Sequence, residues 1–163
     1  MADYLLFTDG SAQPQTREGY GAALLLGPDD RARPLGALSA EIQIFKFTAT
    51  SSTRVELETL LRALQCVPAG CRSLNVYTDS QNILSLPERR TRLEAQDFRS
   101  QKGKALKNAS LYRSFFEALD RIGFTLVKVK GHQPSSKRNG IDQRFNLVDR
   151  AARRACRTGS FGS

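Results

Sequence analysis

Two carboxylates follow short apolar segments that have nearly the same local sequence. Asp9 lies in Phe-Thr-Asp-Gly-Ser at 7–11, and Asp79 lies in Tyr-Thr-Asp-Ser-Gln at 77–81. Ligand sites in mixed α/β sheets form at strand ends, so if the two segments are neighbouring strands, the carboxylates lie within a few ångströms of each other. Like charges at that range repel, and burial adds to the cost. Such a pair must share a proton or a cation.

Two further acids lie at the margin of apolar helix faces. Glu56 has helical spacing with Leu60, at the edge of the apolar side of its segment. Asp149 lies between Phe145 and Ala152 in the same manner, with arginines around it. A carboxylate at such a margin points along a sheet rather than into open water. Each of these acids, taken alone, is also compatible with an ordinary helix surface.

The elements that must position these acids follow from hydrophobic periodicity and from turn residues. We expect antiparallel strands at 4–8, 22–26 and 35–47, the first of them ending in a turn at 9–11. A helix is expected after Ser51, closed by Pro68 and Gly70, and a strand at 74–78, joined in parallel by this crossover. The remaining expectations are a short helix to about 86, a polar, partly helical surface excursion over 88–108, a helix over 111–122, a strand over 124–129, a loop over 131–142 and a helix over about 143–156.

Charge is distributed unevenly along the chain. The net charge is +9, from 25 Lys and Arg against 16 Asp and Glu. Residues 1–85 carry 7 basic and 9 acidic side chains, whereas residues 86–163 carry 18 basic and 7 acidic ones. A basic region beside a separate set of carboxylates indicates a polyanion held by the first and acted on by the second. Charge alone is equally compatible with a solvated basic surface.

Length and composition limit the class of protein. The 163 residues, 40% of them hydrophobic, are enough for one core. No apolar run approaches the roughly 20 residues that span a bilayer, and the first residues do not resemble a secretory signal. An odd count of three cysteines argues against a disulfide framework. We therefore expect a soluble cytoplasmic protein with one domain over 1–157 and a short tail over 158–163.

Six motifs together resemble type 1 ribonuclease H. They occur in that family's order and cover essentially the whole chain: Phe-Thr-Asp-Gly-Ser (7–11), Gly-Tyr-Gly-Ala (19–22), Arg-Val-Glu-Leu (54–57), Thr-Asp-Ser-Gln (78–81), Val-Lys-Gly-His (129–132) and Leu-Val-Asp-Arg-Ala-Ala (147–152). The resemblance implies an α/β, ribonuclease H-like fold, with a five-stranded mixed sheet in the order 3-2-1-4-5 flanked by helices. It also implies a function, which is hydrolysis of the RNA strand of RNA–DNA hybrids to give 5′-phosphates.

The resemblance assigns roles to five residues. Asp9, Glu56, Asp79 and Asp149 match the four metal-binding carboxylates, and His132 matches the mobile histidine beside them. Two divalent ions roughly 3.5–4 Å apart supply the chemistry of phosphodiester hydrolysis, and oxygen ligands favour Mg²⁺, with Mn²⁺ as a possible substitute. An unperturbed imidazole titrates near neutral pH, so His132 is suited to act as a proton carrier or as a group that aids product release. The alternative is a loop histidine without a task.

Substrate contacts are predicted from short polar groups and from basic residues. Gly10, Ser11, Ser52, Thr53 and Gln81 are suited to reading 2′-hydroxyls in a shallow minor groove, and many relatives carry asparagine in place of Ser52 and Thr53. Ser51 is expected to cap its helix and to contact a phosphate of the DNA strand, or to act as a cap alone.

The segment 88–108 corresponds to the basic protrusion of many relatives. Its candidate phosphate contacts include Arg89, Arg90, Lys102, Lys104 and Lys107. The alternative for this segment is a solvated surface helix.

The partner expected from these features is an RNA–DNA hybrid, bound by a monomer, with no membrane and no protein partner. Two other functions remain open at this point. One is a nuclease of the same fold that acts on double-stranded RNA or a junction, and the other is a hybrid- or double-stranded-RNA-binding module that has lost catalysis.

Overall fold

A five-stranded mixed sheet forms the centre of the molecule. The computed structural model describes residues 2–130 and 140–159. The strands are β1 (Tyr4–Ala12), β2 (Gly19–Leu26), β3 (Gln43–Phe47), β4 (Leu74–Thr78) and β5 (Thr125–Lys128). They lie in the order β3-β2-β1-β4-β5, antiparallel within β1 to β3 and parallel from β1 to β4 and β5. This confirms the predicted mixed sheet and its order.

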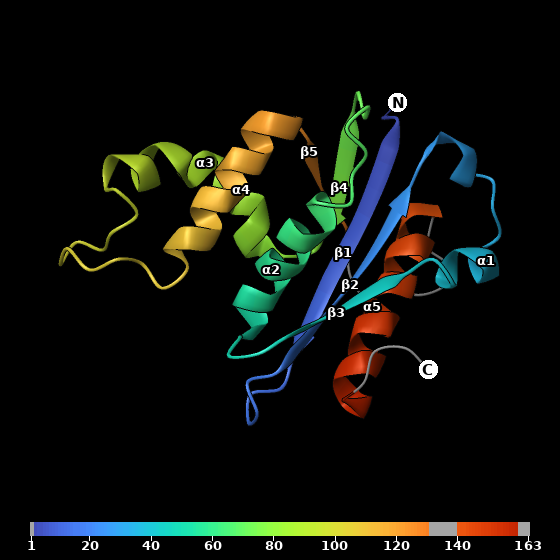
Figure 1. Ribbon diagram of the computed structural model, residues 1–163, viewed down its shortest axis with the longest axis horizontal. Helices are drawn as coiled ribbons and strands as arrows, with labels where there is room; N and C mark the ends of the chain where they lie inside the picture. The colour runs from blue at the N-terminus through green and yellow to red at the C-terminus, as the bar shows by residue number, and fades with distance from the viewer. Residues whose placement is uncertain (1, 131–139, 160–163) are drawn as a thin grey trace.

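Helices cover both faces of this sheet (Figure 1). They are α1 (Leu35–Ser39), α2 (Ser52–Leu64), α3 (Gln81–Ala95), α4 (Ala109–Ile122) and α5 (Gly140–Thr158), with a single 3₁₀ turn, η1 (Pro28–Asp30). Leu6 and Val76 point to the face covered by α2 and α4, whereas Leu5 and Phe7 point to the face covered by α5. No helix in the described ranges is long and apolar enough to cross a membrane.

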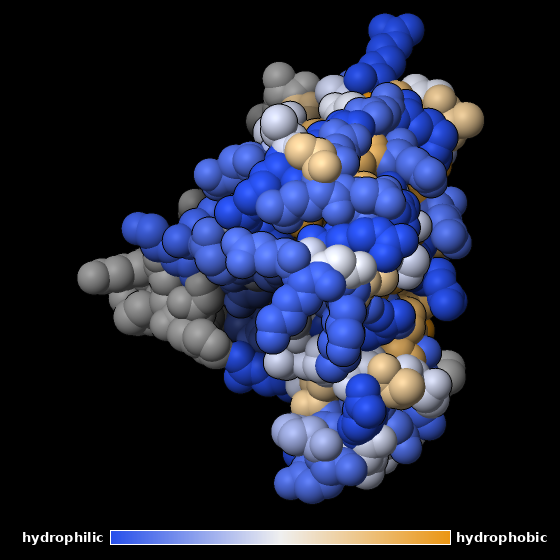
Figure 2. Space-filling model, turned by 90° about the vertical axis from the view of Figure 1, so that its left-hand side faces the viewer, coloured by the Kyte–Doolittle hydropathy of each residue, from blue (hydrophilic) through white to orange (hydrophobic). Residues whose placement is uncertain are grey.

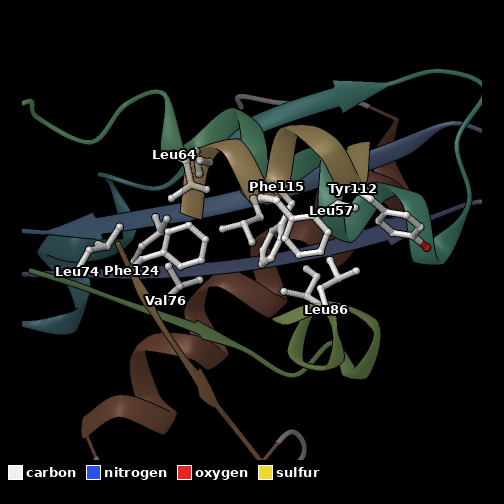
Figure 3. Close-up of a cluster of buried hydrophobic side chains, with 14 of the residues drawn as sticks. Leu57, Leu64, Leu74, Val76, Leu86, Tyr112, Phe115 and Phe124 are labelled. Atoms are coloured by element: carbon white, nitrogen blue, oxygen red, sulfur yellow. The ribbon is translucent and has the colours of Figure 1, made fainter. Parts of the chain in front are cut away.

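The larger core lies between the sheet and the helices α2, α3 and α4 (Figure 3). Leu57, Leu64, Val76, Leu86 and Phe115 are all almost completely buried there. The apolar positions of α2 recur at helical spacing, and Ser51 caps its first turn, since the Ser51 hydroxyl accepts a hydrogen bond from the Arg54 N–H at 3.1 Å. The predicted helix and its cap are therefore confirmed, and they fix the place of Glu56 one turn from the N-terminus.

The strand β1 is longer than the sequence predicts, because the expected turn at 9–11 is wrong. Residues 9–12 continue the strand and pair with 19–22 of β2, from Asp9 opposite Ala22 to Ala12 opposite Gly19. This hairpin satisfies the backbone groups that a turn would have exposed. On its other side β1 pairs with β4 only as far as Phe7 opposite Tyr77. Asp9 therefore lies beside the open end of β4.

Three other boundaries differ from the sequence expectation. Residues 35–39 form the helix α1, not the start of a strand, because they follow Pro34 at the helix N-cap and bury Leu38. The helix α3 passes through Pro87, although proline cannot donate a hydrogen bond to the preceding turn. It continues because Leu93 is buried in the core beyond the proline. The helix α5 begins at Gly140 rather than near 143.

Close contact between α2 and the β1–β2 hairpin depends on glycine residues in the hairpin, because glycine has no side chain. A Cβ atom on Gly21 would lie 1.8 Å from the Thr59 Oγ1, and one on Gly10 would lie 3.0 Å from the Val55 Cγ1. A Cβ atom on Gly21 would also lie 2.7 Å from the Thr59 Cβ, a contact that rotation of the Thr59 side chain cannot relieve, so the helix would have to shift. Glycine at these strand positions therefore lets α2 lie directly on the sheet and brings Glu56 next to Asp9.

Candidate active site

Three acids from three different elements converge at the open end of β4. Asp9 comes from β1, Glu56 from α2, and Asp79 from the first residue after β4. One carboxylate oxygen from each lies within 4.8 Å of the other two. Asp9 is 5% exposed, while Asp79 is the more open of the two aspartates. The geometry therefore forms a pocket of like charges that is reached from the Asp79 side.

Asp149 approaches the same pocket from the opposite face of the sheet. It lies on α5, and its side chain shares a hydrogen bond with Asp9. Its Oδ1 is also 3.1 Å from the Nε of Arg153, one turn further along the helix. Arg153 thus supplies a positive charge next to the cluster. A single arginine cannot balance the four carboxylates that meet there.

The electrostatics of the cluster favour protonated acids when no cation is bound. Burial raises the pKa of Asp9, and the charges of Glu56, Asp79 and Asp149 and the hydrogen bond with Asp149 raise it further. Burial also raises the pKa of Glu56, aided by the charge of Asp79, while hydrogen bonds from Asp9 and from the Gly10 backbone N–H oppose that rise. One oxygen of Glu56, Oε2, is buried and has no hydrogen-bond partner among the described residues. That oxygen is left without a donor.

The other predicted contact residues lie on β1, at the start of α2, at the start of α3 and in the loop between α3 and α4. Gly10 and Ser11 follow Asp9 in β1, Ser51 is the N-cap of α2, Ser52 and Thr53 are exposed in its first turn, and Gln81 is the exposed first residue of α3. Lys102, Lys104 and Lys107 are exposed in the loop between α3 and α4. His132 lies outside the described residues.

Two of the predicted basic contacts are partly occupied within the protein. Arg90 binds both oxygens of Asp120 at 2.7 Å and also contacts Glu94 at 3.0 Å. The Arg89 guanidinium lies over the Tyr112 ring, 5.6 Å from its centroid, and donates to Asn82. Their charges therefore help to hold α3 against α4. Phe98 and Tyr112, the two candidate stacking residues, are buried.

A pocket that the sequence did not reveal lies next to Ser51. It has a volume of about 340 Å³ and is lined by Ala12, Gln13, Pro14, Arg17, Thr50, Ser51, Ser52 and Lys107. Arg17 and Lys107 are basic and form no ion pair with any described residue. The Thr50 N–H donates a hydrogen bond to the Arg17 carbonyl at 2.9 Å, which joins the two segments that line the pocket. The sequence did contain one signal for Arg17. It lies in the turn between two strands predicted to pair, and such a turn must lie at one end of the sheet.

Comparison with known proteins agrees with this architecture. The family model for RNase H matches residues 1–157. A ribonuclease H from Chlorobium phaeovibrioides is 27% identical, covering 89% of this chain and 94% of the relative, and one from Hydrogenovibrio crunogenus is 25% identical, covering 90% and 94%. The solution structure of a PFV RNase H domain superposes with a TM-score of 0.72 at 19% identity, covering 97% of this chain and 96% of that one.

A second solved structure is larger than this chain. The foamy viral protease-reverse transcriptase in complex with an RNA/DNA hybrid gives a TM-score of 0.70 at 17% identity, and the match covers 96% of this chain but only 20% of that one. Both solved structures share the fold. The match of the family model to nearly the whole sequence carries the assignment further, and this chain belongs to the ribonuclease H family.

Proposed function

We propose that the protein is an endonuclease that hydrolyses the RNA strand of RNA–DNA hybrids and leaves 5′-phosphate ends. One observation carries the proposal: Asp9, Glu56 and Asp79 place carboxylate oxygens within 4.8 Å of one another, and Asp149 shares a hydrogen bond with Asp9. Such a cluster destabilises a fold unless it binds protons or cations. Membership of the family supports the choice of reaction.

The four carboxylates suit two hard divalent cations. Their donor atoms are all oxygen, which favours Mg²⁺ or Mn²⁺ over softer metals. The Glu56 Oε2, buried and without a donor among the described residues, has a free lone pair for such an ion. When bound, the ions supply an activated water and neutralise charge at the phosphate and at the leaving 3′ oxygen.

The work of the protein is to hold the acids in place before substrate arrives. Asp9 and Asp79 each lie two residues beyond the last pair of β1 and β4, Phe7 opposite Tyr77, and α2 and α5 bring Glu56 and Asp149 from opposite faces. None of these groups has to reorganise when negative charge develops on the phosphate. Such preorganisation is a large part of catalytic stabilisation in enzymes.

The pocket beside Ser51 supports a contact with the DNA strand. Two basic side chains, Arg17 and Lys107, and the hydroxyls of Ser51 and Ser52 line it. It also lies at the N-terminus of the 13-residue helix α2, where backbone N–H groups favour an anion. We assign this pocket to a phosphate of the DNA strand. Gly10, Ser11, Thr53 and Gln81 are left to read the 2′-hydroxyls of the RNA strand.

The loop between α3 and α4 supplies a further charged contact surface. Figure 2 shows this side of the molecule as mostly hydrophilic. Lys102, Lys104 and Lys107 are exposed and have no ion pair with any described residue. The Arg54 guanidinium donates to Asn108 at 3.1 Å, which ties the end of this loop to α2 near the acids. The loop can therefore hold a duplex that also reaches the catalytic pocket.

Replacing Lys102, Lys104 and Lys107 by Gln tests this surface. We expect KM for a hybrid to rise with kcat nearly unchanged, and the slope of log KM against log salt to fall by about 0.9 for each phosphate that the variant no longer binds. Steady-state kinetics over a series of salt concentrations measures both quantities. As a control, Arg121→Gln removes a charge from an exposed position at the other end of α4 and should leave the slope unchanged. An unaltered slope in the triple variant would mean that the loop is only a solvated surface.

A second prediction concerns His132. We expect His132→Ala to lower kcat by roughly a hundredfold, within the usual contribution of one proton-transfer group, without abolishing cleavage. Single-turnover and multiple-turnover rates, measured over a pH series, separate a role in the chemical step from one in product release. The substitution should also remove the limb of the pH profile near neutrality. We expect the loss in His132→Ala to be smaller than the loss in Asp9→Asn, and equal losses would contradict this expectation.

The test of the proposed function is a cleavage assay on three labelled duplexes. The RNA–DNA hybrid, double-stranded RNA and DNA are each incubated with Mg²⁺, Mn²⁺ or chelator. We expect cleavage of the RNA strand in the hybrid alone, with either metal, and none in chelator. Cleavage of double-stranded RNA would replace the proposed substrate, and binding without cleavage would identify a binding module. We also propose that the protein is a monomer and that it is cytoplasmic; the three free cysteines support the cytoplasmic location.

A further inference from the structure

The outer face of α5 carries a row of arginines that the proposed active site does not use. Arg150, Arg154 and Arg157 recur at intervals of four and three residues, so they lie on one side of the helix. All three are exposed, and none forms an ion pair or a side-chain hydrogen bond with a described residue. We call these three residues the α5 arginine row.

The row has no acidic residue on its own side. The only acids in α5 are Asp142, near its N-terminus, and Asp149, whose carboxylate turns to the catalytic pocket and binds Arg153. Like charges at such spacing destabilise a helix, and no counter-charge in the described residues relieves them here. A row of this kind fits an anionic ligand from outside the chain.

Every basic residue of α5 is arginine and none is lysine. The planar guanidinium matches the oxygens of a phosphate in a bidentate way, whereas lysine offers only a point charge. A helix rises about 1.5 Å per residue, so the three Cα atoms span about 10.5 Å along the axis. That length brings several successive phosphates of one strand within reach of the row.

The position of the row limits what kind of nucleic acid can occupy it. Arg150 is the residue after Asp149, so the row begins beside the catalytic pocket and runs toward the C-terminal end of α5. However, α5 covers the face of the sheet opposite to α2, α3 and α4 (Figure 1). A duplex held by the loop between α3 and α4 lies against the other face, so a flexible single strand that bends around the edge of the sheet is the segment best suited to reach the whole row.

We infer that the α5 arginine row binds the phosphate backbone of a single-stranded segment that extends from the hybrid in the active site. The inference rests on the proposed function for the identity of the duplex. It adds a second contact, independent of sequence, on the other face of the molecule. Its effect is to favour hybrids that adjoin unpaired strand over fully paired ones.

The experiment compares a blunt RNA–DNA hybrid with the same hybrid carrying a single-stranded DNA extension of about 12 nucleotides at either end. Fluorescence anisotropy in chelator measures the Kd of each without cleavage. For the unmodified protein we expect the extension at one end to strengthen binding by about tenfold. The Arg154→Gln/Arg157→Gln variant should lose that gain, bind the blunt hybrid as before, and show a salt slope for the extended hybrid lower by about 1.4.

A matched control removes two charges elsewhere. Arg72 and Arg121 are exposed and lie away from α5, beside the start of β4 and at the end of α4. The Arg72→Gln/Arg121→Gln variant should keep the gain. Circular dichroism and Tm of each variant establish that the fold is retained. Cleavage of the blunt hybrid with Mg²⁺ tests the proposed function separately, and both variants should cleave it normally.

Three results would overturn the inference. The first is no gain from the extension in the unmodified protein. The second is an unchanged gain in the α5 variant; if that variant also loses binding to labelled oligoglutamate, the row is a contact for an acidic polypeptide. The third is an equal loss on blunt and extended hybrids, which would place the row within the duplex site.

Discussion

Asp9→Asn is expected to reduce cleavage of the hybrid by at least about a thousandfold, because removal of one preorganised electrostatic group costs about 10²–10³ and Asp9 lies at the centre of the cluster. A thousandfold loss corresponds to about 4 kcal/mol of transition-state stabilisation. Asn has the same shape as Asp but no charge. The substitution therefore removes the central negative charge of the cluster that Asp9 forms with Glu56, Asp79 and Asp149. Single-turnover cleavage at saturating Mg²⁺ measures the effect.

The same substitution should stabilise the metal-free protein. It removes a buried carboxyl group surrounded by like charges, and the amide can still take part in hydrogen bonds. We therefore expect Tm in chelator to rise as activity is lost. Asp29→Asn is the matched control, since Asp29 is exposed in η1, and it should change neither quantity. Retention of full activity in Asp9→Asn would remove this residue from the proposed metal site.

The second large effect is a fall in the stability of the metal-free protein with rising pH. The pKa values of Asp9 and Glu56 are raised in the folded chain, by burial first and by neighbouring carboxylates second. In the unfolded chain these groups titrate near the usual values of about 4. The folded state therefore binds more protons, and the stability from that binding is complete below about pH 4. It is lost as the pH rises through neutrality toward the raised pKa values.

Thermal melts in chelator from about pH 5 to pH 9 measure this effect. Saturating Mg²⁺ or Mn²⁺ should raise Tm most at the alkaline end, because cations take the place of the released protons. Asp9→Asn should flatten the pH dependence in chelator, and Asp29→Asn should not. A Tm that does not fall with pH, together with no response to either metal, would contradict the cluster's proposed role as a cation site.

Local sequence patterns were enough to predict the elements that carry the acids. Helical spacing and a capping serine identified α2, and with it the position of Glu56. The apolar segments before Asp9 and Asp79 identified two strands, and the crossover between them required a parallel pair. Each of these signals lies within about ten residues of sequence, which is why they can be interpreted without knowledge of the fold.

The errors arose where contacts distant in sequence outweighed local preference. Asp9-Gly10-Ser11 has the composition of a turn, but pairing with β2 extends the strand. Pro87 is a helix breaker, but burial of Leu93 beyond it keeps α3 intact. The ion pair between Arg90 and Asp120 could not be predicted locally either, because Asp120 is 30 residues away on another helix. The pocket that joins Arg17 to Lys107 likewise exists only after the chain has folded.

The bare backbone of Gly21 under Thr59 has a consequence for how such enzymes lose their activity. Gly21 has a hydrogen atom where any other residue would have a Cβ atom, and this allows α2 to pack closely enough to bring Glu56 next to Asp9. A single methyl group there would lift α2 and separate the two acids, while every ionisable residue remained in the sequence. Inactive descendants of this protein can therefore keep all four acids, and an inventory of acids alone will count them as active.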